Sequence, residues 1–522
     1  MTKSKALAAG LLAGLIAGLA MTVTMLLLAW FQVATPLVII GDRISVFIKP
    51  GPFLSLMGRV GGYNHLKQLG VGSTIAGQLF VSMLGGAVVA AVYERRRRWQ
   101  TAATVSTAWT MSILVVLPVV IFAILLWPVL GTSYVGFPIA SARMITLIGF
   151  LLSVLVFERT LVGSFHFLTR PKSQGETAEF SPPIGRRALI LSGLGVLIAG
   201  GGAALLRKLY REAAFSYDGT QYKGRVVRPI TPNDLFYCVT KNVIDPSVNE
   251  KLWHLEVDGL VQNPRAYRIQ DLNTFTQVEQ ETTLMCISNG LDAGLMSNAV
   301  WKGIPLADFL QAAGPLADAR RVRFYGVDNY TDTIPIEKAL EPTTLLAMGM
   351  NGEELADRHG YPMRAIVPGY FGEKHVKWLT RIELTGADAK GFYESQGWGP
   401  DFTVPNRSRI DVPDYDSRFS LGQLGGSPIQ IKGVAFGGDR GISRVEISDD
   451  DGETWGDAKI DYPGTKLTWA LWSYDWQPDG ADDYTLVVRA TDGEGEVQEF
   501  EEDRGWFSGV TGFHKIAVHV IA

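Results

Sequence analysis

Cysteine and metal-binding motifs are scarce in this chain. Of its 522 residues only two are cysteine, Cys238 and Cys286, and seven are histidine. The sequence contains no Cys-x-x-Cys pair, no His-Glu-x-x-His motif and no Cys-x-x-Cys-His haem-attachment motif. A structural zinc site needs about four protein ligands. The sequence therefore excludes a zinc finger, a covalently attached haem and an iron–sulfur cluster held by this chain alone.

An excess of charge of one sign is also lacking. The formal net charge is −4, so the chain shows no basic footprint for nucleic acid. The average hides a division, because residues 1–206 are apolar and poor in carboxylates while nearly all acidic residues follow residue 211. At this length the chain is predicted to form several domains, since single cores seldom exceed about 250–300 residues.

Three long stretches have no charged residue at all, namely 6–41, 68–93 and 103–142. A helix needs about 20 apolar residues to cross a bilayer. With two weaker apolar stretches further on, the sequence predicts an N-terminal transmembrane helical bundle over residues 1–206. Its five spans are expected near 8–31, 72–94, 104–130, 138–162 and 188–206. His65 and His166 lie at span edges and are unpaired, so no haem is expected in this bundle.

Basic clusters predict the orientation of this anchor. Lys3 and Lys5 precede the first span, Arg95–Arg98 follow the second, and further basic residues lie between the fourth and fifth. Five spans put all three clusters on the cytoplasmic side. The remainder of the chain then faces the periplasm or another extracytoplasmic space. Arg186-Arg187 before the last span fits a twin-arginine export signal or an ordinary basic flank, and both interpretations stay open.

Residues after the last span divide into a basic tether, 207–228, and two domains. A mixed α/β region is expected over 229–415, with strands at 252–257 and 322–327 and a helix at 306–313. From 420 to 522, short alternating runs separated by Gly/Asp turns predict an all-β, immunoglobulin-like sandwich. The fold class is therefore a helical anchor, an α+β domain and a C-terminal sandwich.

Cys286, in Leu284-Met285-Cys286-Ile287-Ser288-Asn289, is the candidate metal ligand. A single thiolate binds a soft metal only if a cofactor supplies most of the coordination, as a pterin dithiolene does. Two alternatives remain open. In the first alternative, Cys286 binds no metal and is a small buried apolar residue. In the second, it forms a disulfide with Cys238 in an oxidising compartment.

Several blocks in order resemble the sulfite oxidase family of molybdenum enzymes over residues 230–520. The first is the opening block 230–237, and the second is the Cys-x-x-Asn context of Cys286. Trp-x-Gly-x-x-Leu at 301–306 and Gly-x-Asp at 326–328 follow. The most specific part is His-Gly-x-Pro-x-Arg at 359–364 with Val-Pro-Gly at 367–369 and His-Val-Lys-Trp at 375–378. The C-terminal sandwich resembles the family's dimerisation domain.

This resemblance implies a molybdopterin cofactor with its molybdenum bound to Cys286. Arg364 and Lys377 are expected to supply charge-assisted hydrogen bonds to the pterin phosphate, and Asp328 to accept from the pterin amino groups. The full set of cofactor-binding candidates is Tyr237, Lys241, Asp328, His359, Arg364, His375, Val376 and Lys377. The catalytic candidates are Cys286, Arg440, Tyr237 and Trp398.

The chain departs from the family where sulfite oxidases hold their anion. Val239 and the pair Gly290-Leu291 stand where the family has arginines, and Trp398 falls near the place of its tyrosine. Only Arg440 matches an anion-binding arginine. Charge-assisted contacts contribute about 1.5–3 kcal/mol each, so their loss makes a neutral or less charged oxygen donor or acceptor the expected substrate.

The leading interpretation is a multi-pass, membrane-anchored molybdopterin oxidoreductase that transfers an oxygen atom to or from a small molecule. Without its own haem or iron–sulfur ligands, the chain is expected to exchange electrons with a cytochrome or a quinone-linked protein. The resemblance implies a homodimer. Two alternatives stay open, a sulfite dehydrogenase with a different anion pocket and a membrane-tethered binding protein whose cofactor site has decayed.

Overall fold

The protein is described by a computed structural model. It describes residues 3–98 apart from 46, 48, 61 and 62, and then 112–169, 183–212, 219, 221–242, 245–501 and 508–522. The chain forms two compact units. The first contains residues 1–216 together with the short segments 242–252 and 327–329, and the second contains 217–241, 253–326 and 330–522.

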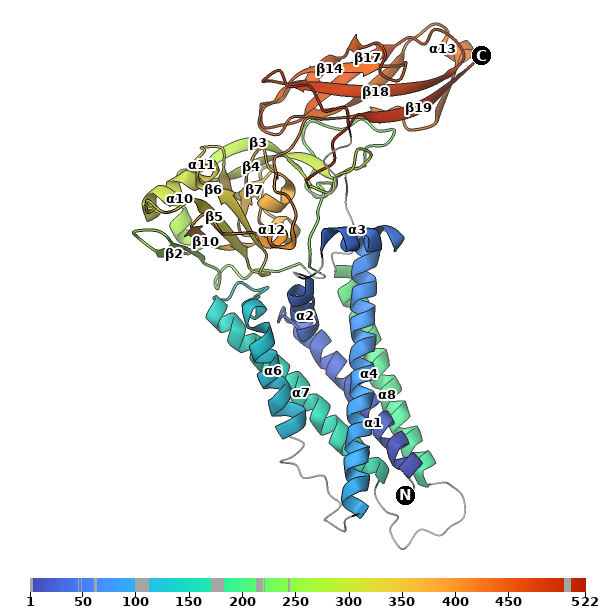
Figure 1. The fold of residues 1–522 in the computed structure, drawn as a ribbon, viewed down its shortest axis with the longest axis vertical. Coiled ribbons are helices and arrows are strands. Elements are labelled where there is room, and N and C mark those ends of the chain that lie inside the picture. The colour runs from blue at the N-terminus through green and yellow to red at the C-terminus, as the bar shows by residue number, and fades with distance from the viewer. Residues whose placement is uncertain are drawn as a thin grey trace. The chain divides into compact units, whose positions relative to one another are not determined.

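Helices make up the first unit (Figure 1). Their bounds are α1 Lys3–Trp30, α2 Pro36–Ser45, α3 Pro50–Arg59, α4 Tyr63–Arg98, the π-helical turn η1 Ser112–Val116, α6 Leu117–Leu126, the 3-10 turn η2 Trp127–Val129, α7 Ile139–Thr169 and α8 Pro183–Glu212. Helix α1 packs against α4, α7 and α8.

Glycines let α1 and α4 approach closely. A Cβ atom on Gly10 would lie 2.4 Å from the carbonyl oxygen of Gly86, and one on Gly14 would lie 2.3 Å from that of Ser82. Small residues four apart are typical of helix pairs in membranes, where close van der Waals packing drives association. As the residue number rises along α1 it falls along α4, so the two helices are antiparallel.

Four helices in the described residues have the length and composition to cross a membrane: Lys3–Trp30, Asn64–Arg95, Ile139–Thr169 and Leu189–Arg207. The third of the five predicted spans, 104–130, has no counterpart among these four and stays a prediction, because its first part lies outside the described residues. Within 104–130 the described apolar helix runs only from Ile113 to Leu126, about 21 Å at 1.5 Å per residue. Pro128 lies in the 3-10 turn that follows. Residues 99–111 fall outside the described part of the chain.

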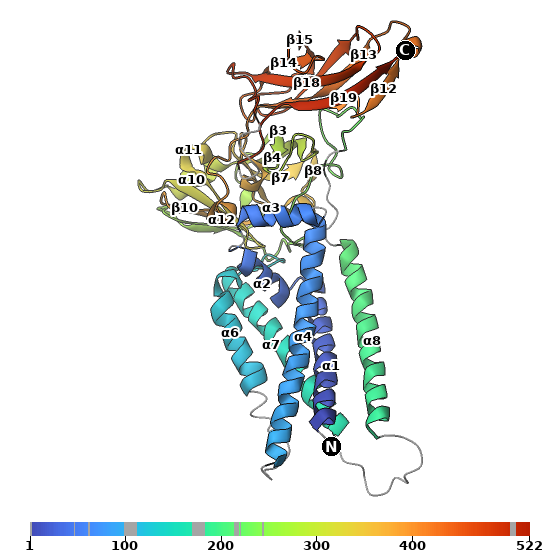
Figure 2. The ribbon, with the colours of Figure 1, turned by 45° about the vertical axis from the view of Figure 1, so that its right-hand side comes forward.

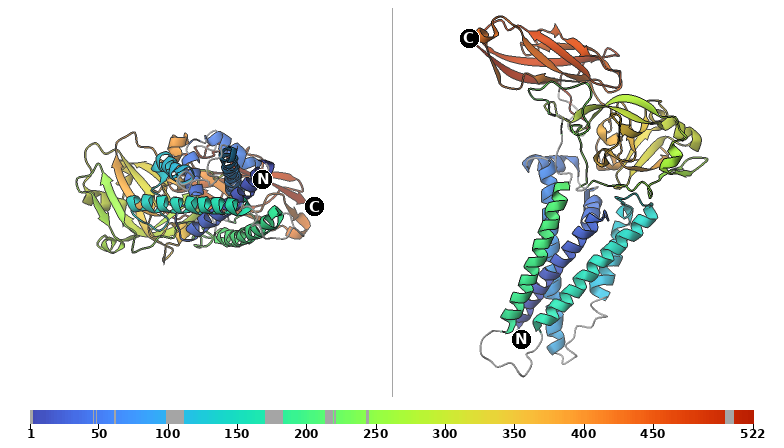
Figure 3. Two further views of the ribbon diagram at one scale, coloured as in Figure 1. Left: turned by 90° about the horizontal axis from the view of Figure 1, so that it is seen from below. Right: turned by 180° about the vertical axis from the view of Figure 1, so that it is seen from behind.

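The ends of α1, α4 and α8 that carry basic residues lie at one end of this bundle. The start of α1, the last turn of α4 and the start of α8 come together there (Figures 1 and 3). Lys3 and Lys5 belong to the first of these ends, and Arg95–Arg98 to the second. This arrangement agrees with the prediction that the basic clusters share one side.

Two sheets form the first part of the second unit. One is a five-stranded mixed sheet of order β2-β1-β10-β5-β6, in which only the β1–β10 pair is parallel. The other has the order β3-β4-β7-β8, with β9 paired to β7. The bounds are β1 Leu255–Gly259, β2 Arg265–Tyr267, β3 Val278–Met285, β4 Met296–Pro305, β5 Arg321–Gly326, β6 Thr331–Pro335, β7 Leu345–Met350, β8 Glu353–Glu354, β9 Arg364–Ile366 and β10 Leu379–Thr385.

Short helices connect these strands. They are α9 Ile269–Leu272, α10 Leu306–Ala313, α11 Ile336–Ala339, α12 Phe392–Gln396 and the 3-10 turns η3 Asp357–His359 and η4 Gly372–Lys374. The predicted helix at 306–313 is confirmed with both ends. Gly314 ends it in the left-handed conformation, with φ of 67°, which glycine adopts without a steric penalty. The predicted strands at 252–257 and 322–327 match β1 and β5 within three residues.

The C-terminal part is a sandwich of two sheets (Figure 2). Their orders are β11-β13-β17-β16 and β12-β19-β18-β14-β15. The bounds are β11 Arg407–Val412, β12 Ser417–Ser420, α13 Leu421–Leu424, β13 Ile429–Phe436, β14 Ile442–Ser448, β15 Gly456–Asp457, β16 Lys459–Tyr462, β17 Ala470–Trp476, β18 Asp483–Asp492 and β19 His514–Ile521. Trp472 and Trp476 are buried in its core. Strand β11 precedes residue 420, so the sandwich starts earlier than the alternating pattern alone indicates.

Candidate active site

Cys286 follows directly after β3, in a tight loop. Its backbone N–H donates to the carbonyl oxygen of Leu295 over 2.9 Å, and its own carbonyl accepts from the N–H of Asn289 over 3.0 Å. The side chain of Asn289 accepts from the N–H of Leu295 over 2.8 Å. The Asn of the Cys-x-x-Asn pattern therefore closes the loop that presents the thiol.

The thiol of Cys286 is buried and free. Its Sγ lies 3.1 Å from Oγ of Ser288, a contact that sequence reasoning did not single out. Burial raises the pKa of the thiol to about 11, the Ser288 hydrogen bond opposes this rise, and the charge of Glu373 adds to it. Cys238 is also free, so the structure does not contain the Cys238–Cys286 disulfide.

Arg364, the first residue of β9, carries its charge into the interior. Its two terminal nitrogens donate to the carbonyl oxygens of His359 and His375, over 3.0 and 3.3 Å. The guanidinium also lies 5.0 Å from the ring centre of Trp301. Its Nε is buried and has no hydrogen-bond partner in the described residues. Among the described residues no carboxylate pairs with this cation, so it is available to an anionic group.

Lys377 lies beside Arg364 because Gly360 allows close packing. A Cβ atom on Gly360 would lie 3.0 Å from Cβ of Lys377 and 3.2 Å from Cβ of Arg364, and φ of Gly360 is 113°. Nζ of Lys377 donates to the carbonyl oxygen of Arg358 over 3.0 Å and lies 3.6 Å from Sγ of Cys238. Like Arg364, it donates to a carbonyl and not to an acid.

His359 is neutral in this environment. Burial lowers its pKa to about 3, its hydrogen bond to Asn233 opposes the shift, and the charge of Arg364 adds to it. Its Nε2 lies 2.8 Å from the carbonyl oxygen of Asn233, so Nε2–H is the donor there. Its ring also packs edge-on against Phe236 at 5.7 Å, which joins the 359–364 block to the opening block.

His375 does not offer the free ring donor that is expected of a cofactor-binding histidine. Its Nδ1 accepts from the N–H of Val367 over 3.1 Å, and its Nε2 lies 3.1 Å from the carbonyl oxygen of Tyr370. Burial, helped by the charge of Arg364, lowers its pKa to about 3. Both ring nitrogens are thus occupied by the backbone of the 367–370 loop. In this arrangement His375 has no ring donor left for a phosphate or a pterin, and it stabilises the loop instead.

Tyr237 and Cys286 come together at Gly372. A Cβ atom on Gly372 would lie 2.6 Å from Oη of Tyr237 and 3.6 Å from Cα of Cys286. Tyr237 and Cys286 also share one buried apolar cluster with Trp301. Three segments far apart in the sequence, the opening block, the cysteine loop and η4, therefore meet around the thiol.

The residues that follow Gly372 belong to a buried charged cluster. Nζ of Lys374 lies 2.7 Å from Asp332 and 3.2 Å from Glu394, and 3.9 Å from the ring centre of Phe402. Glu394 also pairs with Arg321 over 2.8 Å. Sequence reasoning missed Lys374 and Glu373, because in the sequence they read as part of an ordinary charged loop.

Trp398 lies near this cluster, where it stacks edge-on to Tyr393 with ring centres 5.2 Å apart. Tyr393 in turn lies 5.9 Å from Tyr330, whose hydroxyl donates to Asp332 over 2.9 Å. Trp398 is buried. Its catalytic role stays a prediction.

Arg440 is held within its own domain. Its Nε donates to the carboxylate of Asp492 over 2.7 Å, and its Nη2 donates to the side chain of Asn406 over 2.9 Å and to the carbonyl oxygen of Val404 over 3.1 Å. The buried Asp492 thus neutralises Arg440. Its predicted role in anion binding gains no support from these contacts.

Three other candidates are placed without a decisive contact. Val376 is buried, and its carbonyl accepts from the N–H of Ala365 over 2.9 Å. Lys241 is half-buried. Asp328 belongs to the first compact unit, where its buried carboxylate accepts from Asn242 over 2.8 Å. The cofactor-binding roles of these three stay predictions.

Arginines of β11 hold the loop that follows Cys286, and no motif in the sequence pointed to them. Arg407 donates to the carbonyl oxygens of Asn289 and Gly290, over 3.3 and 2.9 Å. Arg409 donates to that of Ala293 over 2.8 Å. Both side chains are buried. The C-terminal sandwich therefore contributes to the geometry of the cysteine loop.

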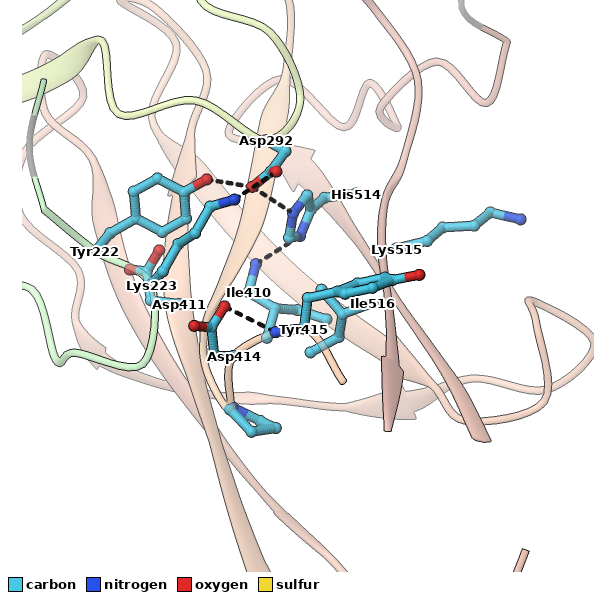
Figure 4. Close-up of a pocket in the computed structure, with 11 residues that line it drawn as sticks. Tyr222, Lys223, Asp292, Ile410, Asp411, Asp414, Tyr415, His514, Lys515 and Ile516 are labelled. Atoms are coloured by element: carbon cyan, nitrogen blue, oxygen red, sulfur yellow. Dashed lines mark hydrogen bonds and ion pairs between the residues drawn. The ribbon is translucent and has the colours of Figure 1, made fainter. Parts of the chain in front are cut away.

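A pocket of about 150 Å³ adjoins this loop at Asp292 (Figure 4). Tyr222 donates to its carboxylate, Lys223 pairs with it over 2.7 Å, and Nε2 of His514 lies 3.9 Å away. The His514 contact, opposed by burial and helped by Lys223, holds the pKa of Asp292 well below its usual range. Asp292 thus ties the cysteine loop to residues 222–223 and to β19.

Comparison with known proteins gives two family matches in order along the chain. Residues 242–393 match the oxidoreductase molybdopterin binding domain, and residues 402–521 match the Mo-co oxidoreductase dimerisation domain.

Individual relatives agree with these matches. The chain is 29% identical to sulfite oxidase of Arabidopsis thaliana over 347 residues, which cover 56% of this chain and 88% of that enzyme. It is 32% identical to mitochondrial sulfite oxidase of Homo sapiens over 343 residues, covering 56% of this chain and 62% of that enzyme.

Among solved structures, the sulfane dehydrogenase SoxCD of Paracoccus pantotrophus has a similar fold. The TM-score is 0.50 at 23% identity, covering 56% of this chain and 82% of that chain. Two family matches in order and relatives that include sulfite oxidases lead to one conclusion: the chain belongs to the sulfite oxidase family of molybdopterin-dependent molybdenum oxidoreductases.

Proposed function

We propose that this molybdenum oxidoreductase is a membrane-anchored, outward-facing enzyme that transfers an oxygen atom to or from a small uncharged molecule. One observation carries the proposal. Two cations of the same unit as the free, buried Cys286, Arg364 and Lys377, donate to backbone carbonyls and have no ion pair with an acid among the described residues. The positions that hold anions in the family carry Val239 and Gly290-Leu291. The site thus has cationic side chains available to bind a cofactor, but few that could bind an anionic substrate.

The residues present fit a molybdopterin. Arg364 has a buried Nε with no partner, and burying an unsatisfied charged donor is costly unless a ligand completes it. Lys377 adds a second cation that donates to a carbonyl. Cys286 supplies the thiolate that a soft metal prefers. When bound, the cofactor supplies two-electron oxygen-atom transfer at molybdenum.

The chain's own residues perform the remaining tasks. Cys286 would hold the metal as thiolate, and burial raises the pKa of its thiol to about 11, so the thiol would have to lose its proton. Arg364 and Lys377 would hold the pterin phosphate. His359 and His375 stay neutral and fix the backbone around these cations, and the aromatic side chains of Tyr237 and Trp398 exclude water.

The anchor and the partners are part of the same proposal. Four apolar helices long enough to cross a membrane support anchoring. The shared end of the basic clusters supports an orientation with the catalytic half outside the cytoplasm. Electrons pass to or from a separate cytochrome or quinone-linked protein, since the sequence has no haem or iron–sulfur motif of its own. The dimerisation-domain match supports a homodimer.

A sulfite dehydrogenase is the second candidate function. The sulfite oxidase relatives favour it, and Arg440 occupies a family anion-binding position. The ion pair between Arg440 and Asp492 argues against it, because a neutralised arginine attracts a dianion less strongly.

The deciding experiment is metal and pterin analysis of the detergent-solubilised full chain. We expect close to one molybdenum per chain, together with the fluorescence of released, oxidised pterin. Reduction by sulfite is then compared with reoxidation by sulfoxides and N-oxides. Neither metal nor pterin in protein from cells that make the cofactor would establish the decayed-site alternative. Rapid reduction by sulfite would establish the second candidate.

A further inference from the structure

The loop that carries Cys286 joins β3 to β4, and we call residues 286–295 the cysteine loop. Hydrogen bonds among Cys286, Asn289 and Leu295 close the base of this loop. Its tip, residues 290–293, lies beyond that base. Because holding a loop in one conformation costs backbone entropy, contacts from other segments are needed to fix the tip.

Arg409 of β11 connects this tip to the tether. Its Nη1 donates to the carbonyl oxygen of Ala293 over 2.8 Å, and its guanidinium carbon lies 3.7 Å from the ring centre of Tyr222. The carboxylate of Asp411 accepts from Nε of Arg409 over 2.7 Å, and its backbone carbonyl accepts from the N–H of Gly224 over 2.8 Å. Arg409, Asp411 and Tyr222 are all buried. The tether therefore packs on the same arginine that holds the tip.

Asp292 makes a second connection between the tip and the tether (Figure 4). The hydroxyl of Tyr222 donates to the carboxylate of Asp292, and Nζ of Lys223 lies 2.7 Å from it. Tyr222 is only 5% exposed, and a buried tyrosine hydroxyl needs a hydrogen-bond partner. Lys223 and Asp292 are both exposed, so their ion pair contributes little. The hydroxyl of Tyr222 is thus the contact that fixes Asp292.

One side chain of the tether therefore reaches both supports of the tip, with its ring on Arg409 and its hydroxyl on Asp292. Resting on the proposed role of Cys286 as the metal ligand, we propose that Tyr222 is a positioning residue for this thiol. By fixing the tip, Tyr222 holds the cysteine loop in the conformation that presents Cys286 to the metal. The tether, which follows the last apolar helix, then supports the site as well as linking it to the helices.

The first test needs no cofactor. The full chain, made in cells that do not produce the cofactor, is alkylated with iodoacetamide in detergent, and the Cys286 and Cys238 peptides are quantified by mass spectrometry. Both thiols are free and buried, so a general loosening of the fold raises both rates, whereas release of the cysteine loop raises only the rate at Cys286. Tyr222→Phe keeps the ring on Arg409 and removes the hydroxyl. It is expected to raise the Cys286-to-Cys238 ratio at least about fivefold.

Three further variants make this test specific for the hydroxyl contact. Tyr415→Phe removes a hydroxyl from the same pocket that points away from Asp292 (Figure 4), and should leave the ratio within about twofold. Asp292→Leu removes the acceptor of the Tyr222 hydroxyl and should raise the ratio as Tyr222→Phe does. Asp292→Asn keeps an acceptor oxygen and should restore the ratio to within about twofold of the wild type.

The second test uses the molybdenum-loaded protein. After dialysis in detergent, Tyr222→Phe is expected to retain at least about fivefold less molybdenum than the wild type, because residues that orient a metal ligand affect how firmly the metal is held. An unchanged alkylation ratio in Tyr222→Phe, or a parallel rise at both cysteines, would overturn the positioning role. A wild-type protein without molybdenum would instead refute the proposed function, and the alkylation ratio would still decide whether Tyr222 fixes the cysteine loop.

Discussion

Two groups of cations in the second compact unit differ in what they contact. Arg364 and Lys377 donate to backbone carbonyls and have no acid partner. Lys374 and Arg440 each pair with a buried carboxylate, Asp332 and Asp492 respectively. A buried charge needs a partner, so the first pair indicates a missing anion, and the second pair is already complete. The comparison separates cofactor-binding charge from structural charge within one domain.

The largest expected effect comes from replacing the proposed metal ligand, Cys286. Cys286→Ser removes the only candidate thiolate ligand, and we expect activity to fall more than about a thousandfold, since no other side chain near the metal can replace it. Cys238→Ser is the matched control and should retain activity. Full activity in Cys286→Ser would rule out the molybdenum–thiolate assignment.

Arg364→Met removes an unneutralised cation while keeping most of the side-chain volume. We expect the molybdenum and pterin content of the purified chain to drop about tenfold or more, because each charge-assisted contact to a phosphate contributes about 1.5–3 kcal/mol. Elemental analysis measures this directly. A variant that keeps its full cofactor content would show that Arg364 is structural, like Lys374.

Lys374→Met breaks a buried ion pair and leaves Asp332 without its cation. We expect the free energy of unfolding of the full chain to fall by about 3–5 kcal/mol. The exposed pair Lys459–Asp461, with a 2.8 Å contact, offers the control, since Lys459→Met should leave the free energy of unfolding nearly unchanged. Equal losses in both variants would contradict the distinction between the two kinds of pair.

In its effects on stability and cofactor content, Arg440→Met should resemble Lys374→Met and not Arg364→Met. We expect a loss of about 1.5–3 kcal/mol in stability, from the broken contact with Asp492, and an unchanged molybdenum content. Denaturant unfolding and elemental analysis on the same preparation check both. Loss of cofactor without loss of stability would place Arg440 in the first group.

The smallest expected effect is the contribution of His359 to the pH dependence of the free energy of unfolding. Its folded pKa of about 3 lies below the ordinary 6.5, so in acid the unfolded state binds a proton that the folded state does not. Stability from this group is present above pH 6.5 and is lost as the pH falls toward 3. Between pH 7 and 5 the loss is about 2 kcal/mol. His359→Gln should unfold with a correspondingly weaker dependence on pH, and an identical slope would refute a neutral buried imidazole.

Motif spacing identified Cys286 as a candidate metal ligand and Arg364 and Lys377 as candidate cofactor-binding cations, but it could not predict hydrogen-bond partners. His375 looked like a cofactor donor because the motif is dense in cations, yet both ring nitrogens bond to the backbone of its own loop. Arg440 matched a family position, yet Asp492, 52 residues away, neutralises it. Such partners depend on which loops fold together.

The N-terminal helices show the same limit of prediction from sequence. Apolar runs correctly predicted four helices that are long and apolar enough to cross a membrane, because length and hydropathy are properties of the sequence. Composition did not show that the described apolar helix within 104–130 ends at Leu126, before Pro128.

By itself the sequence determined the apolar N-terminal helices, the order of the domains and Cys286 as the candidate metal ligand, because these depend on composition and local pattern. Only the tertiary structure decided which of the described charges are paired, and it alone brought Gly372, Tyr237 and Cys286 to one place. The physical reason is that the energy of a buried charge depends on its neighbours, and those neighbours come from distant parts of the chain.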